Sequence, residues 1–169
     1  NLSDVFFSQV ITKYEGTRLG RQELNAEILE DVEGALWNMS MIDKNRVKEP
    51  PQLQRIVVAI DPAVTSKATS DETGIVVAGK GIDGKGYVLD EKTGIYSPNQ
   101  WATLAISLYD KWKADRIVGE VNNGGDLIET VIRNIDNTIS YKSVHASRGK
   151  VIRAEPVVSL YEQGRVKHV

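Results

Sequence analysis

The chain has 169 residues, 41% hydrophobic and 26% charged, so it is long enough to bury one core and too short for two comfortable domains. It contains no cysteine and only two histidines, which excludes a disulfide framework, a thiol nucleophile and a Cys-based metal site and leaves little for a His-rich one. The formal net charge of −2 excludes a globally basic nucleic-acid binder, so any such face must be local.

Membrane and export signals are missing from the sequence. No apolar run approaches the roughly 18 residues that a membrane helix needs, and the chain does not start with a basic segment followed by an apolar one. We therefore expect a soluble, intracellular protein with no membrane partner. Because the chain begins at Asn1 and ends at Val169 directly after a predicted strand, we also expect it to be a piece of a longer protein.

The first fifty residues differ in composition from the rest. Residues 15–43 contain seven acidic residues against two arginines, and their apolar residues are spaced for one helix face. Pro50 and Pro51 then interrupt regular structure. We predict an acidic, helical N-terminal arm over residues 1–50 and a separate domain over residues 51–169.

Strands begin this domain. Residues 56–60 form a continuous apolar run, which is typical of a central strand buried on both faces. Residues 73–78 and 86–89 predict two further strands, and the short connections favour antiparallel pairing. A helix is expected to follow over 98–112, with Ser97 as its N-cap and an apolar stripe toward the sheet.

The remaining chain alternates between strand and helix. The predicted elements are a strand at 116–119, a helix around 127–132, a strand at 141–144, a helix over 150–163 and a last strand at 165–169. Pro156 should kink or restart the long helix, and Gly164 should end it. The sum predicts an α/β fold: an antiparallel meander followed by parallel strands in one mixed sheet, flanked by helices.

Two acids follow predicted core strands directly, Asp61 after 56–60 and Glu120 after 116–119. Since a buried lone carboxylate is costly, such acids normally have a cation, hydrogen bonds or solvent beside them. A divalent metal is one solution, and an Asx-type turn at Asp61 is the alternative. Hairpin pairing would bring Asp71 or Glu72 toward Asp61 as a third oxygen donor, although either acid can instead lie in a solvated loop. Asp126 more simply caps the following helix.

Oxygen ligands without cysteine favour Mg²⁺ or Mn²⁺ over zinc. Clustered acids that hold two such ions roughly 4 Å apart carry out in-line phosphodiester hydrolysis. Charge agrees with this chemistry, because residues 139–169 carry a local charge of +4. Within this strip, basic side chains can contact phosphates, the alternative being a solvated helix face; the candidates are Lys142, Arg148, Lys150 and Arg153.

Four blocks of the sequence, in order, resemble the large terminase subunit of tailed bacteriophages and prophages. They are EGTRLGRQELNAEILEDVEGALW, IVVAIDPAVTSKATSDETGIVVAG, IVGEVNNGGDLI and VHASRGKVIRAEPVVSLYEQGRVKHV, and together they span nearly the whole chain. The ATPase motor of that family carries a GxxxxGK[ST] loop, which is absent here. The resemblance is therefore to the C-terminal part of the family, with residues 1–50 as the end of the motor and its connection.

The resemblance implies an RNase H-like nuclease domain, an endonuclease that cuts concatemeric viral DNA with two Mg²⁺ or Mn²⁺ ions. Family metal ligands carry over to Asp61 and Glu120, and Asp71 takes the position of a further acid. The family's last catalytic aspartate lies beyond Val169, so we expect the C-terminal end of the domain to be missing and this site to be incomplete and weakly active.

The implied partners are double-stranded DNA, the motor domain of the same protein, the portal and the small terminase subunit, in the cytoplasm of the bacterial host. An alternative function is a non-catalytic docking module that contacts the portal or the small subunit, which the acidic arm favours. A sugar-kinase or actin-like ATPase half-domain is a third possibility, but its phosphate loop is glycine-rich, whereas the loop AVTSKATSDET contains no glycine.

Overall fold

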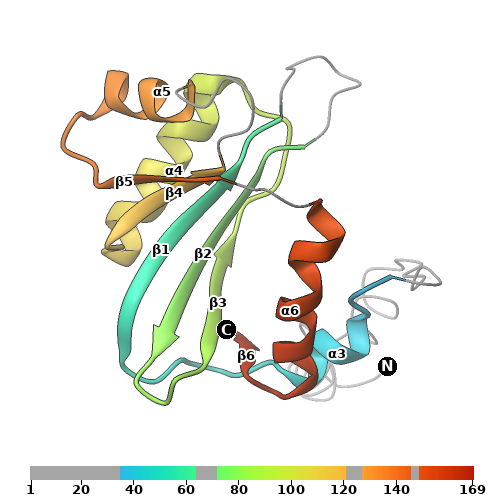
Figure 1. Cartoon of the computed structure of the whole chain (residues 1–169). Coiled ribbons are helices and arrows are strands. Elements are labelled where there is room, and N and C mark those ends of the chain that lie inside the picture. The colour runs from blue at the N-terminus through green and yellow to red at the C-terminus, as the bar shows by residue number, and fades with distance from the viewer. Residues whose placement is uncertain (1–34, 64–71, 121–126, 146–148) are drawn as a thin grey trace, which may run out of the picture.

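The computed structural model describes residues 35–63, 72–120, 127–145 and 149–169. Most of the predicted acidic arm therefore lies outside the described residues. The described elements, labelled in Figure 1, are α3 (Met39–Lys44), β1 (Leu53–Asp61), β2 (Gly74–Gly81), β3 (Gly86–Glu91), α4 (Pro98–Trp112), β4 (Arg116–Glu120), α5 (Leu127–Ile135), β5 (Tyr141–Val144), α6 (Lys150–Glu162) and β6 (Val166–His168). The predicted mixed sheet with flanking helices is confirmed.

The strands form a six-stranded sheet in the order β5-β4-β1-β2-β3-β6. β1, β2 and β3 are an antiparallel meander, while β4 pairs parallel to β1 and β5 pairs parallel to β4. β6 joins the far edge, parallel to β3. The carboxyl ends of β1, β4 and β5 therefore meet at one end of the sheet.

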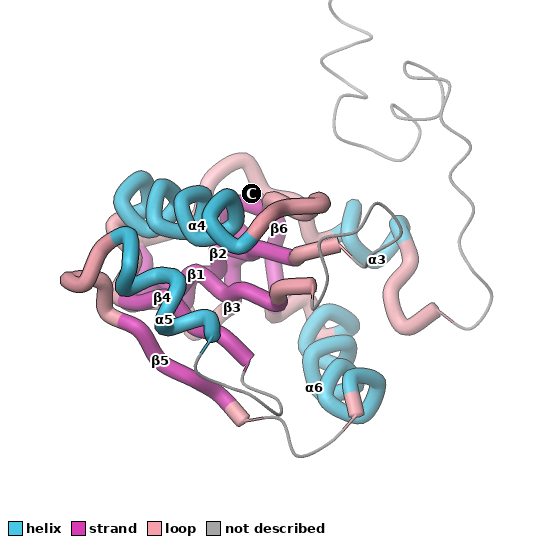
Figure 2. The backbone as a smooth tube through the Cα atoms, turned by 90° about the horizontal axis from the view of Figure 1, so that it is seen from above, coloured by secondary structure: helices cyan, strands magenta, loops and turns pink. Residues whose placement is uncertain are grey.

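The core lies between the sheet and helices α4 and α5. Alternate residues of the central strands are fully buried on this face, as period-2 strands require, among them Val58, Ile60, Ile75 and Val77. Trp101, Leu108 and Ile132 bury their side chains against them. Figure 2 shows α4 and α6 on opposite sides of the sheet. One face of the sheet is thus the core face, and α6 lies on the side of the other.

Local sequence signals set several helix ends. Ser97 and Gln100 form a capping box at the start of α4, as its N-cap position predicted. Gly164 has a φ of +67° just after α6, which fits its predicted role as a stop. α6 itself runs through Pro156 without restarting. Proline removes one backbone donor and its ring crowds the carbonyl of Ile152, so its place inside α6 costs stability without ending the helix.

The chain segment before β1 also contacts the sheet. The backbone N–H of Val47 donates to the carbonyl of His168 at 2.7 Å, and the N–H of His168 donates to the carbonyl of Asn45 at 2.9 Å. Residues 45–47 thereby lie along the outer edge of β6. Within the described residues, none of the helices has the length and apolar character needed to cross a membrane.

Candidate functional site

Strand register brings two acids together. Ile60 of β1 pairs with Gly119 of β4, and Asp61 and Glu120 follow these two residues on neighbouring parallel strands. Both Ile60 and Gly119 are buried on the core face, so the next residue of each strand projects to the opposite face. The two carboxylates therefore share one end and one face of the sheet, the end nearest the first turn of α6 (Figure 1).

Each carboxylate is engaged by a cation from α6. Lys150 Nζ lies 2.8 Å from Asp61 Oδ2. Arg153 donates to both oxygens of Glu120, at 2.6 Å and 3.2 Å, in a two-bond fork. Because Lys150 and Arg153 stand three residues apart on one helix, they share a helix face. Four charged groups of net charge zero thus form one cluster at the end of β1 and β4.

The two ion pairs differ in exposure. The side chains of Asp61 and Lys150 are 58% and 74% exposed. Those of Glu120 and Arg153 are only 14% and 35% exposed. The hydrogen bond and charge of Asp61 raise the pKa of Lys150, Glu120 adds to the increase, and Arg153 and burial oppose it. Both acids therefore affect the pKa of Lys150, so the two ion pairs interact electrostatically.

The donor chemistry of this pair fits a hard divalent cation. Mg²⁺ is commonly held by one or two carboxylates, with water and substrate phosphate oxygens completing its shell. Asp61 and Glu120 supply such oxygens from fixed strand ends. Within the described ranges, no group of three or more metal-ligating side chains occurs. The predicted third acid, Asp71, lies outside the described residues.

The predicted DNA-contacting residues fall into three situations. Lys142 is exposed on β5, and its register partner Val118 shows that it lies on the same face as Glu120. Lys150 and Arg153, predicted to contact phosphates, here contact carboxylates. Arg148 lies outside the described residues. Their assignment to DNA stays a prediction.

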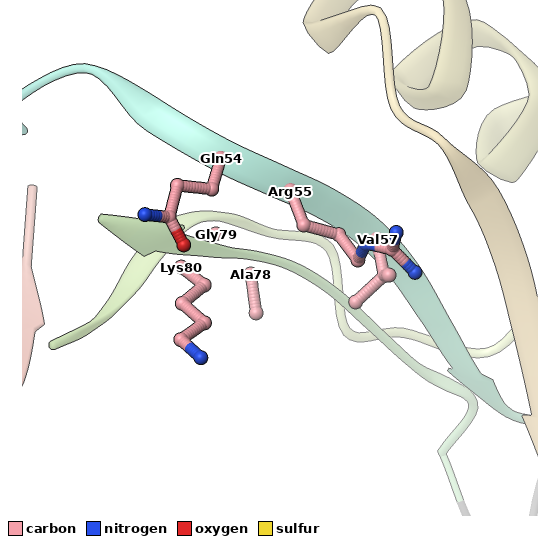
Figure 3. Close-up of a pocket in the computed structure, with 6 residues that line it drawn as sticks. All are labelled: Gln54, Arg55, Val57, Ala78, Gly79 and Lys80. Carbon is pink, nitrogen blue, oxygen red and sulfur yellow. The ribbon is translucent and has the colours of Figure 1, made fainter. Parts of the chain in front are cut away.

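Sequence reasoning did not foresee the ion pairs between α6 and the strand ends. The i, i+3 spacing of Lys150 and Arg153 was a visible signal, but nothing local indicates that this face of α6 meets β1 and β4. It also missed a hollow of about 510 Å³ over β1 and β2, lined by Gln54, Arg55, Val57, Ala78, Gly79 and Lys80 (Figure 3). Arg55 and Lys80 add two exposed basic residues there.

The antiparallel meander and the parallel strands beside it form the mixed sheet of an RNase H-like α/β domain. Residues 58–169 match the family described as the terminase RNaseH-like domain. The chain belongs to this family. No curated protein matches the chain.

Solved structures agree on the fold. The large terminase of bacteriophage HK97 matches with a TM-score of 0.58 and 14% identity, over 80% of this chain and 34% of that one. The large terminase nuclease of thermophilic phage G20c, solved with bound magnesium, matches with a TM-score of 0.50 and 14% identity, over 76% of this chain and 71% of that one. Its cobalt-bound form gives a TM-score of 0.50 and 15% identity over the same shares. The chain thus spans about a third of the HK97 protein.

Proposed function

We propose that this chain is the nuclease part of a DNA-packaging terminase, a divalent-metal-dependent endodeoxyribonuclease that acts in the cytoplasm of a bacterial host. The observation that carries the proposal is the register of β1 and β4, because Asp61 and Glu120 follow paired residues and lie on the sheet face opposite the core. Family membership supports the same function, and the G20c nuclease domain, similar in fold, has been solved with magnesium and with cobalt.

Metal ions bound at such a carboxylate pair would activate water and stabilise the leaving oxygen of a phosphodiester. The residues of this chain have separate parts in that chemistry. Asp61 and Glu120 hold the metal, and Asp71 is the proposed third ligand. The backbone of double-stranded DNA is positioned by Lys142, Arg148, Lys150 and Arg153, because phosphate contacts set register without reading sequence.

The motor domain of the same protein, the portal and the small terminase subunit are the proposed protein partners. A non-catalytic docking module for the portal or the small subunit is the rival function. Three side chains of α6 favour some form of docking, since they are large, apolar and exposed: Val151, Ile152 and Val157. A docking module should neither bind Mn²⁺ through Asp61 nor cut DNA.

Plasmid nicking and Mn²⁺ titration test the nuclease proposal. Asp61→Asn and Glu120→Gln should each lower Mn²⁺-dependent nicking by at least about a hundredfold, because even outer-shell partners of a metal cost 10–100-fold. Circular dichroism should show that both variants keep the wild-type fold. Matched controls are Asp110→Asn on α4 and Glu162→Gln on α6, both exposed.

Mn²⁺ affinity, measured by isothermal titration, gives a second result that does not depend on turnover. The wild-type chain should bind Mn²⁺, and both site variants should bind it at least tenfold more weakly, since each loses a charged oxygen ligand. Equal Mn²⁺ binding by the wild type and the two site variants would remove these acids from the site. It would favour the docking module.

A further inference from the structure

The first turn of α6 is attached to the sheet mainly through charge. Lys150 and Arg153 contact the carboxylates, while Val151 and Ile152 between them are exposed. Tyr161, near the other end, is the buried residue of this helix within the described chain. It stacks edge-on against Trp37 and hydrogen-bonds to His168. Packing thus fixes the C-terminal end of α6, and ion pairs position its start.

We propose that Lys150 and Arg153 are exchangeable counter-ions of the carboxylate pair, so that binding of a divalent metal and binding of DNA are coupled through α6. A carboxylate that binds a metal releases its cation, and the released cation contacts a DNA phosphate. The inference rests on the proposed function of Asp61 and Glu120 as metal ligands and adds a regulation of that site.

Competition follows from the contact distances. Lys150 Nζ lies 2.8 Å from Asp61 Oδ2, and the Arg153 fork contacts both oxygens of Glu120, so the two cations occupy three of the four carboxylate oxygens that a metal could bind. Mg²⁺ bonds oxygen ligands at about 2.0–2.1 Å, so a cation kept in hydrogen-bond contact with the same oxygen would face a doubly charged ion at close range. The charge balance of the cluster can be met by the two side chains or by the metal.

Exchange also changes what the two cations can contact. While Lys150 and Arg153 are bonded to the carboxylates, these two side chains have fewer hydrogen-bond donors left for a phosphate. The adjacent acids also repel DNA. Once the acids are balanced by a metal, both side chains can turn toward a phosphate oxygen, a good partner for Arg in particular. Linkage then requires the reciprocal effect, because DNA that engages the cations must strengthen metal binding by the same factor.

The two ion pairs should not contribute equally. The pair between Asp61 and Lys150 is largely exposed, and such pairs are weak. The Arg153–Glu120 fork is partly buried and has two charge-assisted hydrogen bonds, so its loss should matter more. Arg153 is therefore the stronger competitor of the metal, and Lys150 the weaker.

Mn²⁺ titration of neutral variants is the first test. Lys150→Met should tighten Mn²⁺ binding about threefold, as expected for an exposed pair. Arg153→Met should tighten it about tenfold or more, as expected for a charged, partly buried fork. The matched controls break other ion pairs of the described chain: Lys85→Met, which pairs with Asp83, and Arg133→Met, which pairs with Glu129. These controls should leave Mn²⁺ affinity within twofold of the wild type.

The second test measures DNA affinity with and without Ca²⁺. Ca²⁺ serves as the divalent metal because this measurement needs DNA binding and not cleavage. In the wild type, Ca²⁺ should tighten binding to a short DNA duplex, and in the Lys150→Met and Arg153→Met variants most of this gain should disappear. Lys142→Met is the informative control, because Lys142 is exposed on β5 with its register partner Val118 on the same face. It should weaken DNA binding equally in both conditions and keep the gain.

Further measurements distinguish a variant that fails to fold from a failure of the inference. Because loss of Arg153 leaves Glu120 partly buried without this partner, thermal unfolding checks that Arg153→Met folds, and Lys150→Met tests the inference independently if it does not. Arg153→Lys keeps the charge but loses the two-bond fork, so its Mn²⁺ affinity should lie between those of the wild type and Arg153→Met. Unchanged or weaker Mn²⁺ binding by the folded Met variants overturns the coupling. The proposed function fails separately, if Asp61→Asn binds Mn²⁺ as well as the wild type.

Discussion

Gly119, the residue before Glu120, lies close to side chains of β5 and α5 because it has no side chain of its own. A Cβ atom at this glycine would lie 2.5 Å from Tyr141 Oη and 2.9 Å from Ile128 Cδ1. The tyrosine belongs to β5 and the isoleucine to α5, so a larger residue would push both away from β4. The close approach of strand and helix beside the site therefore depends on a residue without a side chain.

Gly119→Ala should destabilise the domain by about 1–3 kcal/mol, because an added carbon in a packed site forces its neighbours to shift. Since Glu120 is the next residue, Mn²⁺ affinity should fall as well. Urea denaturation and Mn²⁺ titration measure the two effects. Gly86→Ala is the control, because a Cβ there meets only Val166 at 3.7 Å and Arg165 at 4.0 Å. Equal stability of the two variants would contradict the packing argument.

At the level of single residues, the sequence predicts the acids better than their partners. Asp61 and Glu120 stand out because each directly follows an apolar run, a purely local signal. Lys150 lies 89 residues from Asp61 in sequence and still contacts it. That contact depends on where α6 returns over the sheet, which no local pattern encodes. The sequence therefore assigns Lys150 and Arg153 to DNA phosphates or to a solvated helix face, and not to the two acids.

Among the elements, α4 and α6 show why some helices are easier to place than others. α4 has a capping box and buries four residues on one side, so its limits and its core face follow from sequence. α6 buries Tyr161, and several of its apolar side chains remain exposed. A helix without a clear apolar stripe gives no sequence signal for the surface that it covers.

Trp101 tests how much α4 contributes to the fold. It is 2% exposed and belongs to the buried cluster between α4 and the sheet. Trp101→Ala should lower the free energy of unfolding by about 3–5 kcal/mol, the usual cost of deleting a buried aromatic side chain. Chemical denaturation followed by circular dichroism measures it. Ser107→Ala, an exposed position on the same helix, should change stability by less than about 0.5 kcal/mol. A small effect at Trp101 would mean that α4 is not essential to the core.

In the molecule as a whole, a segment before β1 pairs with the last strand, β6, at the outer edge of the sheet. Residues 45–47 pair with the last strand, and Lys167 Nζ donates to Asn45 Oδ1 at 2.9 Å. The sequence predicts the mixed sheet, because short connections favour the antiparallel meander and alternating helices favour parallel strands. It does not predict this edge, since the partners are separated by 122 residues and their strands are short.

His168 makes stability depend on pH at this edge of the sheet. Its ring contacts Tyr161, whose hydroxyl lies 2.7 Å from Nε2, and its backbone pairs with residues 45–47. Burial lowers the pKa of His168 below its usual 6.5, and the charge of Arg46 lowers it further. Between the lowered pKa and 6.5, the unfolded chain therefore binds more protons than the folded one, so the neutral ring favours folding above about pH 6.5.

Stability from His168 should be lost as the pH falls below about 6.5 toward the lowered pKa. We expect the melting temperature to drop by about 1–3 °C between pH 7.5 and pH 5.5 on this account, from the usual relation of free energy to melting temperature in a chain of this size. Differential scanning fluorimetry measures it. His168→Gln should reduce the drop, because glutamine can keep a hydrogen bond to Tyr161 but does not titrate. His145→Gln removes the other, exposed histidine and should leave the drop intact. An unchanged pH dependence in His168→Gln would show that protonation of the half-buried His168 ring is not coupled to folding.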